Sequence, residues 1–380
     1  MKSFLDIFIQ RGLGYEMEKN DLEEKFAQTD FRDEKKKMVK KGVRMKTFLT
    51  IGICVILFPL FCLINQAEST NPKQRVGKDR GQVSAVEVVR AQFGSGPDHI
   101  GVTTPPEANP EGPMSFALGR DGEIYILDQI NSRIQVFKSG KRVRTIPISI
   151  KESVEFKDIA LTPDSKIVLL GRFYVKGHEK ASIYIIDSSG KILNVISLED
   201  RSLVPDSGEV TEMQIVREGK FSGIWVELEQ RSVRVASLDG KSIERISVPG
   251  KLSLNGRRLF RAEKIGDTTA VIYRSEEDNL SKWEPERTVY FEVEIVHLLG
   301  LWDDQNGRTY LGAFLEDQSN TFNTIVVLSP EGKELRRLKL FVQKMPHEIY
   351  HSVRVSPDGH IFQMALNDPG VFVRRYDLTY

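Results

Sequence analysis

The stretch Ser115–Ile148, SFALGRDGEIYILDQINSRIQVFKSGKRVRTIPI, determines the fold of this chain. It divides into four short runs rich in β-branched and aromatic residues, SFALG, EIYILD, RIQVF and RVRTIPI, separated by polar connectors. Asp121-Gly122 supplies the positive φ angles that tight hairpin turns require. The pattern predicts four antiparallel strands joined by short turns within about 35 residues, which is typical of one propeller blade.

The same turn signals recur along the rest of the chain. An inner turn is predicted at six places: Asp121-Gly122, Asp164-Ser165, Glu218-Gly219, Gly266-Asp267, Asn306-Gly307 and Asp358-Gly359. A Gly-Lys turn before a final strand recurs at Gly140, Gly190, Gly240 and Gly332, with one missing in the fourth unit near residues 257–295. Six turns with a period of about 40 to 54 residues predict an all-β, six-bladed β-propeller of four-stranded antiparallel blades.

Ser115–Phe137 resembles the NHL repeat of six-bladed β-propellers, in which a strand, an Asp-Gly turn and a second strand precede a conserved tail pattern. This chain has that tail as Asp128, Asn131, Arg133, Ile134, Val136 and Phe137. The resemblance implies the propeller fold for the region 83–380. Its members range from binding scaffolds to lyases and lactonase-like hydrolases, so function has to be argued from the site.

The two ends of the ring are predicted to pair. The run Val371–Tyr376 reads as the third strand of the sixth blade, and too little sequence follows it for a fourth. Val83–Phe93 is strand-like and precedes the first complete blade. Because an open blade would expose an unpaired edge, we predict that this segment closes the last blade antiparallel to Val371–Tyr376.

The composition excludes several classes of protein. The net charge is +1, with 54 Lys and Arg against 53 Asp and Glu, so no nucleic-acid partner is expected. The 2 cysteines, Cys54 and Cys62, cannot form a disulfide scaffold or a Cys-rich zinc site. The propeller region has no cysteine, and its core must therefore stabilise it.

An uncharged stretch, TFLTIGICVILFPLFCLI at residues 47–64, follows the charged tail 1–46. At about 1.5 Å per residue it is just long enough to cross a bilayer as one transmembrane helix. The Lys and Arg residues before it predict a cytoplasmic N-terminus and a single-pass cell-membrane protein. The linker 65–82 and the propeller would then be extracytoplasmic. In the alternative reading, translation starts at Met45 and a cleaved signal sequence leaves the propeller secreted.

One catalytic motif occurs, His347-Glu348-Ile349-Tyr350-His351, which matches H-E-x-x-H. Zinc proteases need this motif on a helix, but Pro346 precedes it and a strand is predicted directly after it, so coincidence or a structural histidine pair is the better interpretation. A weaker hypothesis places His99, His347 and His351 near one end of the channel as ligands of Zn or Ca. No cofactor is otherwise indicated.

Two further features of the sequence concern loops and turns. Asp128, Asn131 and Arg133 are predicted to hold turns rather than to form a site. The loop Gly94–Met114 is long and rich in Pro and Gly, which favours a functional loop or a lid. These patterns together predict a membrane-anchored binding or scaffold module for a protein or small ligand. They favour this function over an enzymatic one. The alternative is a lyase or lactonase-like hydrolase with a metal in the channel.

Overall fold

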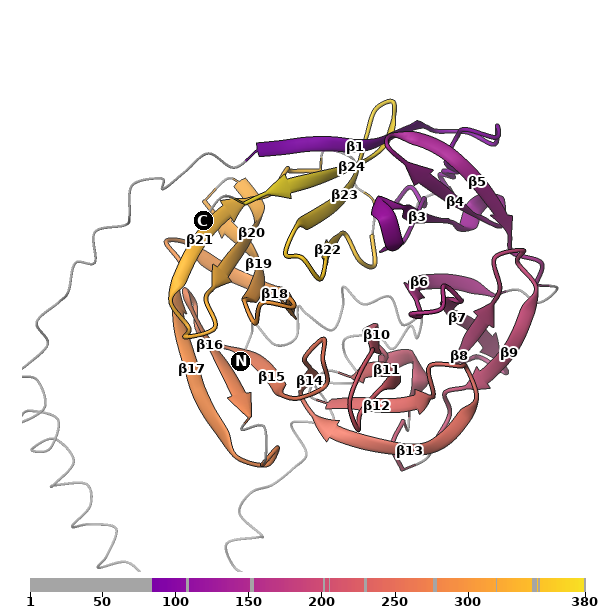
Figure 1. Cartoon of the computed structure of the whole chain (residues 1–380). Helices are drawn as coiled ribbons and strands as arrows, with labels where there is room; N and C mark the ends of the chain where they lie inside the picture. The colour runs from indigo at the N-terminus through magenta and orange to yellow at the C-terminus, as the bar shows by residue number, and fades with distance from the viewer. Residues whose placement is uncertain are drawn as a thin grey trace, which may run out of the picture. The chain divides into compact units, whose positions relative to one another are not determined.

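The computed structural model describes residues 84–378 of the chain, apart from short gaps at 107–108, 151–153, 201, 205, 229–230, 276–278, 319, 344–346 and 348. Six four-stranded antiparallel sheets follow one another around a ring (Figure 1). The chain from 84 to 378 is therefore an all-β, six-bladed propeller, as the turn period predicted.

The strands of blades one to five run from the centre of the ring outward in chain order, and in blade six the first strand of the chain takes the outermost place. Blades one and two comprise β2 (Phe116–Leu118), β3 (Ile124–Asp128), β4 (Arg133–Lys138) and β5 (Lys141–Pro147), then β6 (Glu155–Leu161), β7 (Ile167–Val175), β8 (His178–Ile186) and β9 (Ile192–Ser197). Blades three and four comprise β10 (Glu212–Val216), β11 (Gly223–Leu228), β12 (Arg231–Ala236) and β13 (Ser242–Pro249), then β14 (Lys251–Leu252), β15 (Leu259–Gly266), β16 (Thr269–Ser275) and β17 (Trp283–Tyr290). Blades five and six comprise β18 (Glu294–Asp303), β19 (Thr309–Asp317), β20 (Asn320–Leu328) and β21 (Glu334–Lys339), then β22 (Val353–Val355), β23 (Ile361–Asn367) and β24 (Gly370–Asp377). Three single turns of 3-10 helix lie in connections: η1 (Arg120–Gly122), η2 (Gln129–Asn131) and η3 (Ser207–Glu209).

The prediction of ring closure is confirmed. β1 (Ser84–Gln92) forms the outer strand of blade six and pairs antiparallel with β24, from Ser84 opposite Asp377 to Gln92 opposite Gly370. The first and last strands of the propeller therefore lie side by side (Figure 1). Backbone hydrogen bonds join the two ends of the ring, which has no disulfide to do so.

The core is divided among the blade boundaries. Six clusters of buried apolar side chains each join two neighbouring blades, including one between blades six and one to which β1 contributes Val89 and Ala91. The boundary between blades three and four has the smallest cluster, centred on Trp225. Because each blade buries its faces only against its neighbours, ring closure is needed to cover the outer faces of blades one and six.

The fourth blade corrects one prediction. We expected its inner turn at Gly266-Asp267, but that turn connects the second and third strands, β15 and β16. The inner turn is Ser253–Arg258, where Gly256 has a φ of +68°. The Ser253 hydroxyl accepts hydrogen bonds from the backbone of Arg257 and Arg258, as the hydroxyls of Thr162 and Ser356 do in the inner turns of blades two and six.

The predicted tail 1–46, membrane segment 47–64 and linker 65–82 lie outside the described residues. Within the described part of the chain, no helix is long and apolar enough to cross a membrane. The transmembrane helix, the signal sequence and the orientation of the chain remain predictions.

Candidate functional site

A cluster of charged side chains lies at the axis of the ring. Asp158, Glu212, Lys251 and Arg354 come from the innermost strands of blades two, three, four and six, and Ser115 precedes the innermost strand of blade one. Arg354 donates to Glu212 at 2.9 Å. Blades six and three lie opposite one another in the ring (Figure 1), so the ion pair between Arg354 and Glu212 crosses the axis.

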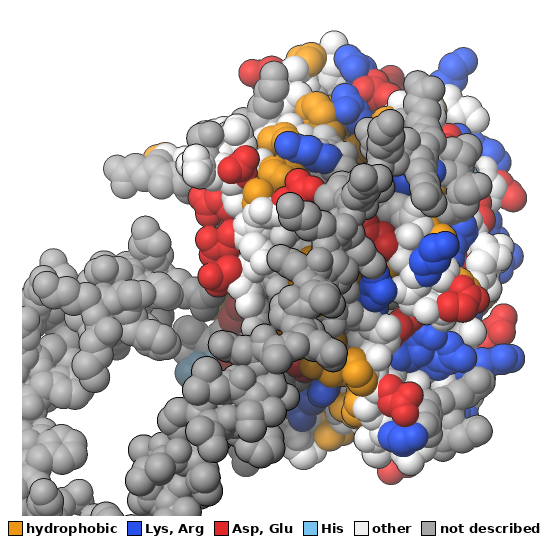
Figure 2. All heavy atoms as spheres, turned by 90° about the vertical axis from the view of Figure 1, so that its left-hand side faces the viewer, with side chains coloured by type: hydrophobic (Ala, Val, Ile, Leu, Met, Phe, Trp, Pro, Cys, Tyr) orange, Lys and Arg blue, Asp and Glu red, His pale blue; other side chains and the backbone are white. Residues whose placement is uncertain are grey.

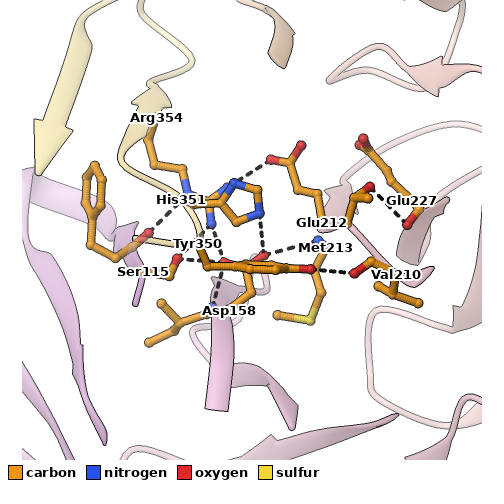
Figure 3. Close-up of polar contacts among 12 residues, drawn as sticks. Ser115, Asp158, Val210, Glu212, Met213, Glu227, Tyr350, His351 and Arg354 are labelled. Carbon is orange, nitrogen blue, oxygen red and sulfur yellow. Dashed lines mark hydrogen bonds and ion pairs between the residues drawn. The ribbon is translucent and has the colours of Figure 1, made fainter. Parts of the chain in front are cut away.

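Asp158 is the most heavily bonded member of the cluster. Its buried carboxylate accepts from the Ser115 hydroxyl at 2.6 Å, from Arg354 at 2.5 Å and from the backbone N–H of Met213 at 3.1 Å (Figure 3). Arg354 also donates to the Phe116 carbonyl at 3.1 Å. Buried charges are tolerated when they are paired and hydrogen-bonded in this way. These bonds tie blades one, two, three and six together at the axis.

Lys251 lies between two carboxylates of blade three. Its Nζ is 2.5 Å from Glu212 and 3.0 Å from Glu227. Burial acts to raise the pKa of Glu212, but the charges of Lys251 and Arg354 outweigh it and lower that pKa to about 2. Glu227 has fewer cationic partners, and burial raises its pKa to about 7. Blade five contributes the Trp302 ring, 6.0 Å from Lys251 Nζ.

Tyr350 and His351 come from the connection between β21 and β22 and extend the cluster toward one end of the ring. The Tyr350 hydroxyl donates to the Val210 carbonyl at 2.5 Å, and Arg172 donates to the same carbonyl at 2.8 Å. His351 packs edge-on against Tyr350, with ring centres 4.8 Å apart, and its Nε2 is 3.5 Å from Asp158 (Figure 3). Burial lowers the pKa of His351, so its imidazole is neutral at pH 7.

Two buried polar atoms near Tyr350 make no hydrogen bond. They are Nε2 of His351 and Nε of Arg172. Leaving a buried polar atom unsatisfied costs about 1 to 3 kcal/mol, and such atoms in native structures call for an explanation. The arrangement can therefore bind a group with oxygen acceptors, and the neutral imidazole beside Asp158 can transfer a proton.

The three histidines predicted as metal ligands have different surroundings. His351 belongs to the axial cluster. His347 is buried, with Nδ1 2.5 Å from the Pro110 carbonyl oxygen, and His99 lies against Gly94 and Gly96 in the long loop. Within the described residues, no group of three or more His, Cys, Asp or Glu side chains is arranged to hold a metal ion. His347, Ile349, Tyr350 and His351 are not helical, and Glu348 lies outside the described residues, so a metal site remains a hypothesis.

Asp128 and its neighbours hold a loop, as predicted. The buried Asp128 carboxylate accepts from the Gly101 backbone at 2.7 Å, from Asn131 and from Arg133. Arg133 also donates to the carbonyls of Gly96 and His99, both at 2.7 Å. These contacts fix the start of the loop 94–114 on blade one.

Sequence reasoning missed Asp158, Arg172, Glu212, Lys251 and Arg354 as members of a site. They lie on four different blades, and nothing in their spacing along the chain links them. One signal could have identified all of them except Arg172, which lies on the second strand of blade two: a charged residue in a predicted innermost strand can face the axis, where it needs a partner of opposite charge.

No family model and no curated protein matches the chain. Among solved structures, a streptogramin B lyase is similar with 12% identity and a TM-score of 0.41, covering 78% of this chain and 98% of that one. The PQQ-bound aldose sugar dehydrogenase of Streptomyces coelicolor has 11% identity and a TM-score of 0.43, with 78% and 98% covered. Virginiamycin B lyase from Staphylococcus aureus has 12% identity and a TM-score of 0.39, with 78% and 99% covered. Such distant likeness says nothing of the activity of this chain, whose class, a six-bladed β-propeller, follows from its own sheets.

Proposed function

We propose that this chain is a membrane-anchored, extracytoplasmic propeller of the NHL type that binds a small-molecule or protein ligand through the axial cluster. The observation that carries the proposal is the pair of unsatisfied buried groups, His351 Nε2 and Arg172 Nε, beside Tyr350. The anchor is residues 47–64, and the charge pattern around them supports an exported ring.

The ligand chemistry follows from the groups that lack partners. Arg172 Nε–H is a charged donor, and a neutral imidazole can present an N–H at Nε2. A carboxylate, which is planar and acceptor-only, complements both. The ligand is therefore a small carboxylate or a protein segment that presents one, bound where the connections before β10 and β22 meet.

A thermal unfolding assay tests the carboxylate site. The full chain in detergent is heated with acetate, succinate, citrate or N-acetylglutamate, each against chloride at equal ionic strength. At about a hundredfold excess over Kd, a bound carboxylate should raise Tm by roughly 5 °C. Arg172→Gln should abolish the rise.

Arg245→Gln is the matched control. Arg245 donates to the Leu198 carbonyl much as Arg172 donates to the Val210 carbonyl, and the two side chains are 17% and 16% exposed. This variant should keep the rise in Tm. If no carboxylate raises Tm, or if Arg172→Gln responds like the wild type, the proposed site is wrong.

The second candidate is an enzyme of the lyase or lactonase-like hydrolase type. The observation in its favour is the neutral His351 next to Asp158, an arrangement suited to proton transfer. Metal analysis of the purified chain separates the metal-dependent form of this candidate from the binding module. Stoichiometric Zn or Ca that is lost on substitution of His99 and His347 would favour the enzyme, and a metal-free preparation would favour the binding module.

A further inference from the structure

The outermost strand of every blade is a sheet edge, and five of the six carry charged side chains. Charge on an edge strand discourages pairing with another chain. The charged residues on these five strands are Glu87 and Arg90 in β1, Lys141, Arg142 and Arg144 in β5, Glu244 and Arg245 in β13, Glu284, Glu286 and Arg287 in β17, and Glu334, Arg336, Arg337 and Lys339 in β21. On the side of the ring formed by blades four and five, basic and acidic side chains intermingle (Figure 2).

The outer strand of blade two differs from these five. β9 has the sequence ILNVIS and contains no charged residue. Its side chains Leu193 and Val195 are 45% and 47% exposed, and Ile192 is exposed as well. β9 is the last strand of its sheet, so the backbone groups of alternate residues point away from β8. An apolar, uncharged strand edge of this kind is a template for another strand.

We propose that β9 is a homodimer interface, in which β9 of a second copy of this chain pairs with it antiparallel around a two-fold axis. An isologous interface of this kind brings the same strand from both copies together. The two blades would then form one continuous eight-stranded sheet.

The charges that flank β9 favour a second copy and define the register. With Val195 opposite Val195, the exposed Leu193 lies opposite Ser197. Lys191, directly before the strand, lies opposite Glu199, two residues after it, which Lys180 of the same copy already pairs. Opposite charges therefore meet at both ends of the paired strands, while no charge faces a like charge between them. Shifting the register by two residues loses both of these Lys–Glu pairings.

Two local bonds have to be exchanged when the strands pair, and one of them is the bond that Arg245 of blade three donates to the outward-facing Ser197 carbonyl. In the other, the Asn194 side chain accepts from the Val195 N–H at 2.9 Å, which caps a donor on β9. Pairing replaces both bonds with inter-strand ones, and Asn194 keeps its bond to the Gly240 carbonyl of the next blade.

The mass of the full chain in solution tests the proposal. Sedimentation equilibrium in a density-matched detergent should show a dimer of 43.2 kDa protomers. Val195→Lys places two like charges opposite each other and should weaken the dimer about tenfold or more. Val143→Lys is the control, since Val143 lies on β5, the outer strand of blade one, and is 53% exposed between Arg142 and Arg144. It should leave the dimer unchanged.

Cross-linking tests the register and distinguishes β9 from any contact through residues 47–64. In a background with Cys54→Ser and Cys62→Ser, Val195→Cys should form a disulfide between the two copies on mild oxidation. Val143→Cys should not. A wild-type chain that is monomeric up to about 100 μM would overturn the proposal, since a functional dimer interface should hold at that concentration. A dimer that survives Val195→Lys in a folded protein would overturn it too, as would the absence of the Val195→Cys cross-link.

Discussion

Arg354 illustrates how single residues stabilise this ring. Its guanidinium contacts residues of blades one, two and three from its own place on blade six. A planar guanidinium with five donors can serve several acceptors at once, which a lysine cannot do. The positive charge of Arg354 compensates the buried negative charges of Asp158 and Glu212.

Replacing Arg354 should therefore destabilise the whole propeller. Arg354→Met leaves two buried carboxylates without their bridging cation, and the free energy of unfolding should fall by about 3 to 5 kcal/mol. Urea denaturation measures this. Arg375→Met, which breaks a half-buried pair with Asp377 on the same strand, should cost about 1 kcal/mol or less. Equal losses in the two variants would contradict the axial role of Arg354.

The raised pKa of Glu227, about 7, predicts a pH dependence of stability. The unfolded carboxyl titrates near 4.5, so between pH 4.5 and 7 the folded state holds a proton that the unfolded state has lost. Stability therefore falls as the pH rises through this window, by up to about 3 kcal/mol, and levels off above pH 7. Glu212, with its pKa lowered to about 2, acts in the opposite direction and only below about pH 4.5.

Glu227→Gln should remove the contribution of Glu227 to this fall in stability, while Asp303, whose buried carboxyl also has a pKa raised to about 7, keeps its own. Because glutamine resembles the protonated acid, the variant and the wild type should have similar free energies of unfolding at pH 5. At pH 8 the variant should be the more stable, and urea midpoints across this range measure the difference. The exposed Glu284→Gln should follow the wild type. A difference for Glu227→Gln that is the same at pH 5 and pH 8 would show that burial does not raise this pKa.

At the level of elements, local sequence signals predicted most strands because propeller hairpins are short and closed by Gly. The four runs of Ser115–Ile148 correspond to β2, β3, β4 and β5. Blade four was harder to predict because two Gly-containing turns, at Gly256 and Gly266, compete within ten residues. Only the Gly256 turn has the positive φ and the side-chain bonds of an inner turn.

The closing strand β1 should be essential to the fold. Deleting residues 84–92 exposes β24 as an edge and removes Val89 and Ala91 from the core between blades six and one. We expect a loss of more than about 3 kcal/mol, measured by urea denaturation with intrinsic fluorescence. Deleting residues 66–74, nine residues of the predicted linker, is the length-matched control and should have no effect on the midpoint. Identical midpoints in the two deletions would contradict the closure.

At the level of the whole molecule, the sequence predicted the site less well than the fold. The periodic turns are local and can be read directly, whereas Asp158, Glu212 and Arg354 meet only because the ring brings opposite blades together. The H-E-x-x-H motif drew attention to His347, whose ring bonds to the Pro110 carbonyl. The second histidine of the motif, His351, lies in the axial cluster for a different reason, since it stands two residues before β22, the innermost strand of blade six.

The predicted topology of the chain can be tested independently of the ring. A reporter that is active only outside the cytoplasm, fused after Tyr380, should be active in the full-length protein. Exchanging the Lys and Arg residues at positions 35–46 for Gln should reduce that activity, because these charges are predicted to hold the N-terminus inside. A cytoplasmic signal from the full-length fusion would contradict the extracytoplasmic placement.

The central claim is that a ligand binds at the axis beside His351, and histidine NMR tests it most directly. All 6 histidines lie within residues 84–380, which hold every strand of the closed ring, so this segment can be labelled and titrated alone. On addition of the carboxylate that raises Tm most, the ring signals of His351 should shift and saturate. The signals of His178, His297 and His360 should not move. Saturable shifts at His99 or His347 with none at His351 would place the ligand on the loop 94–114 and contradict the account.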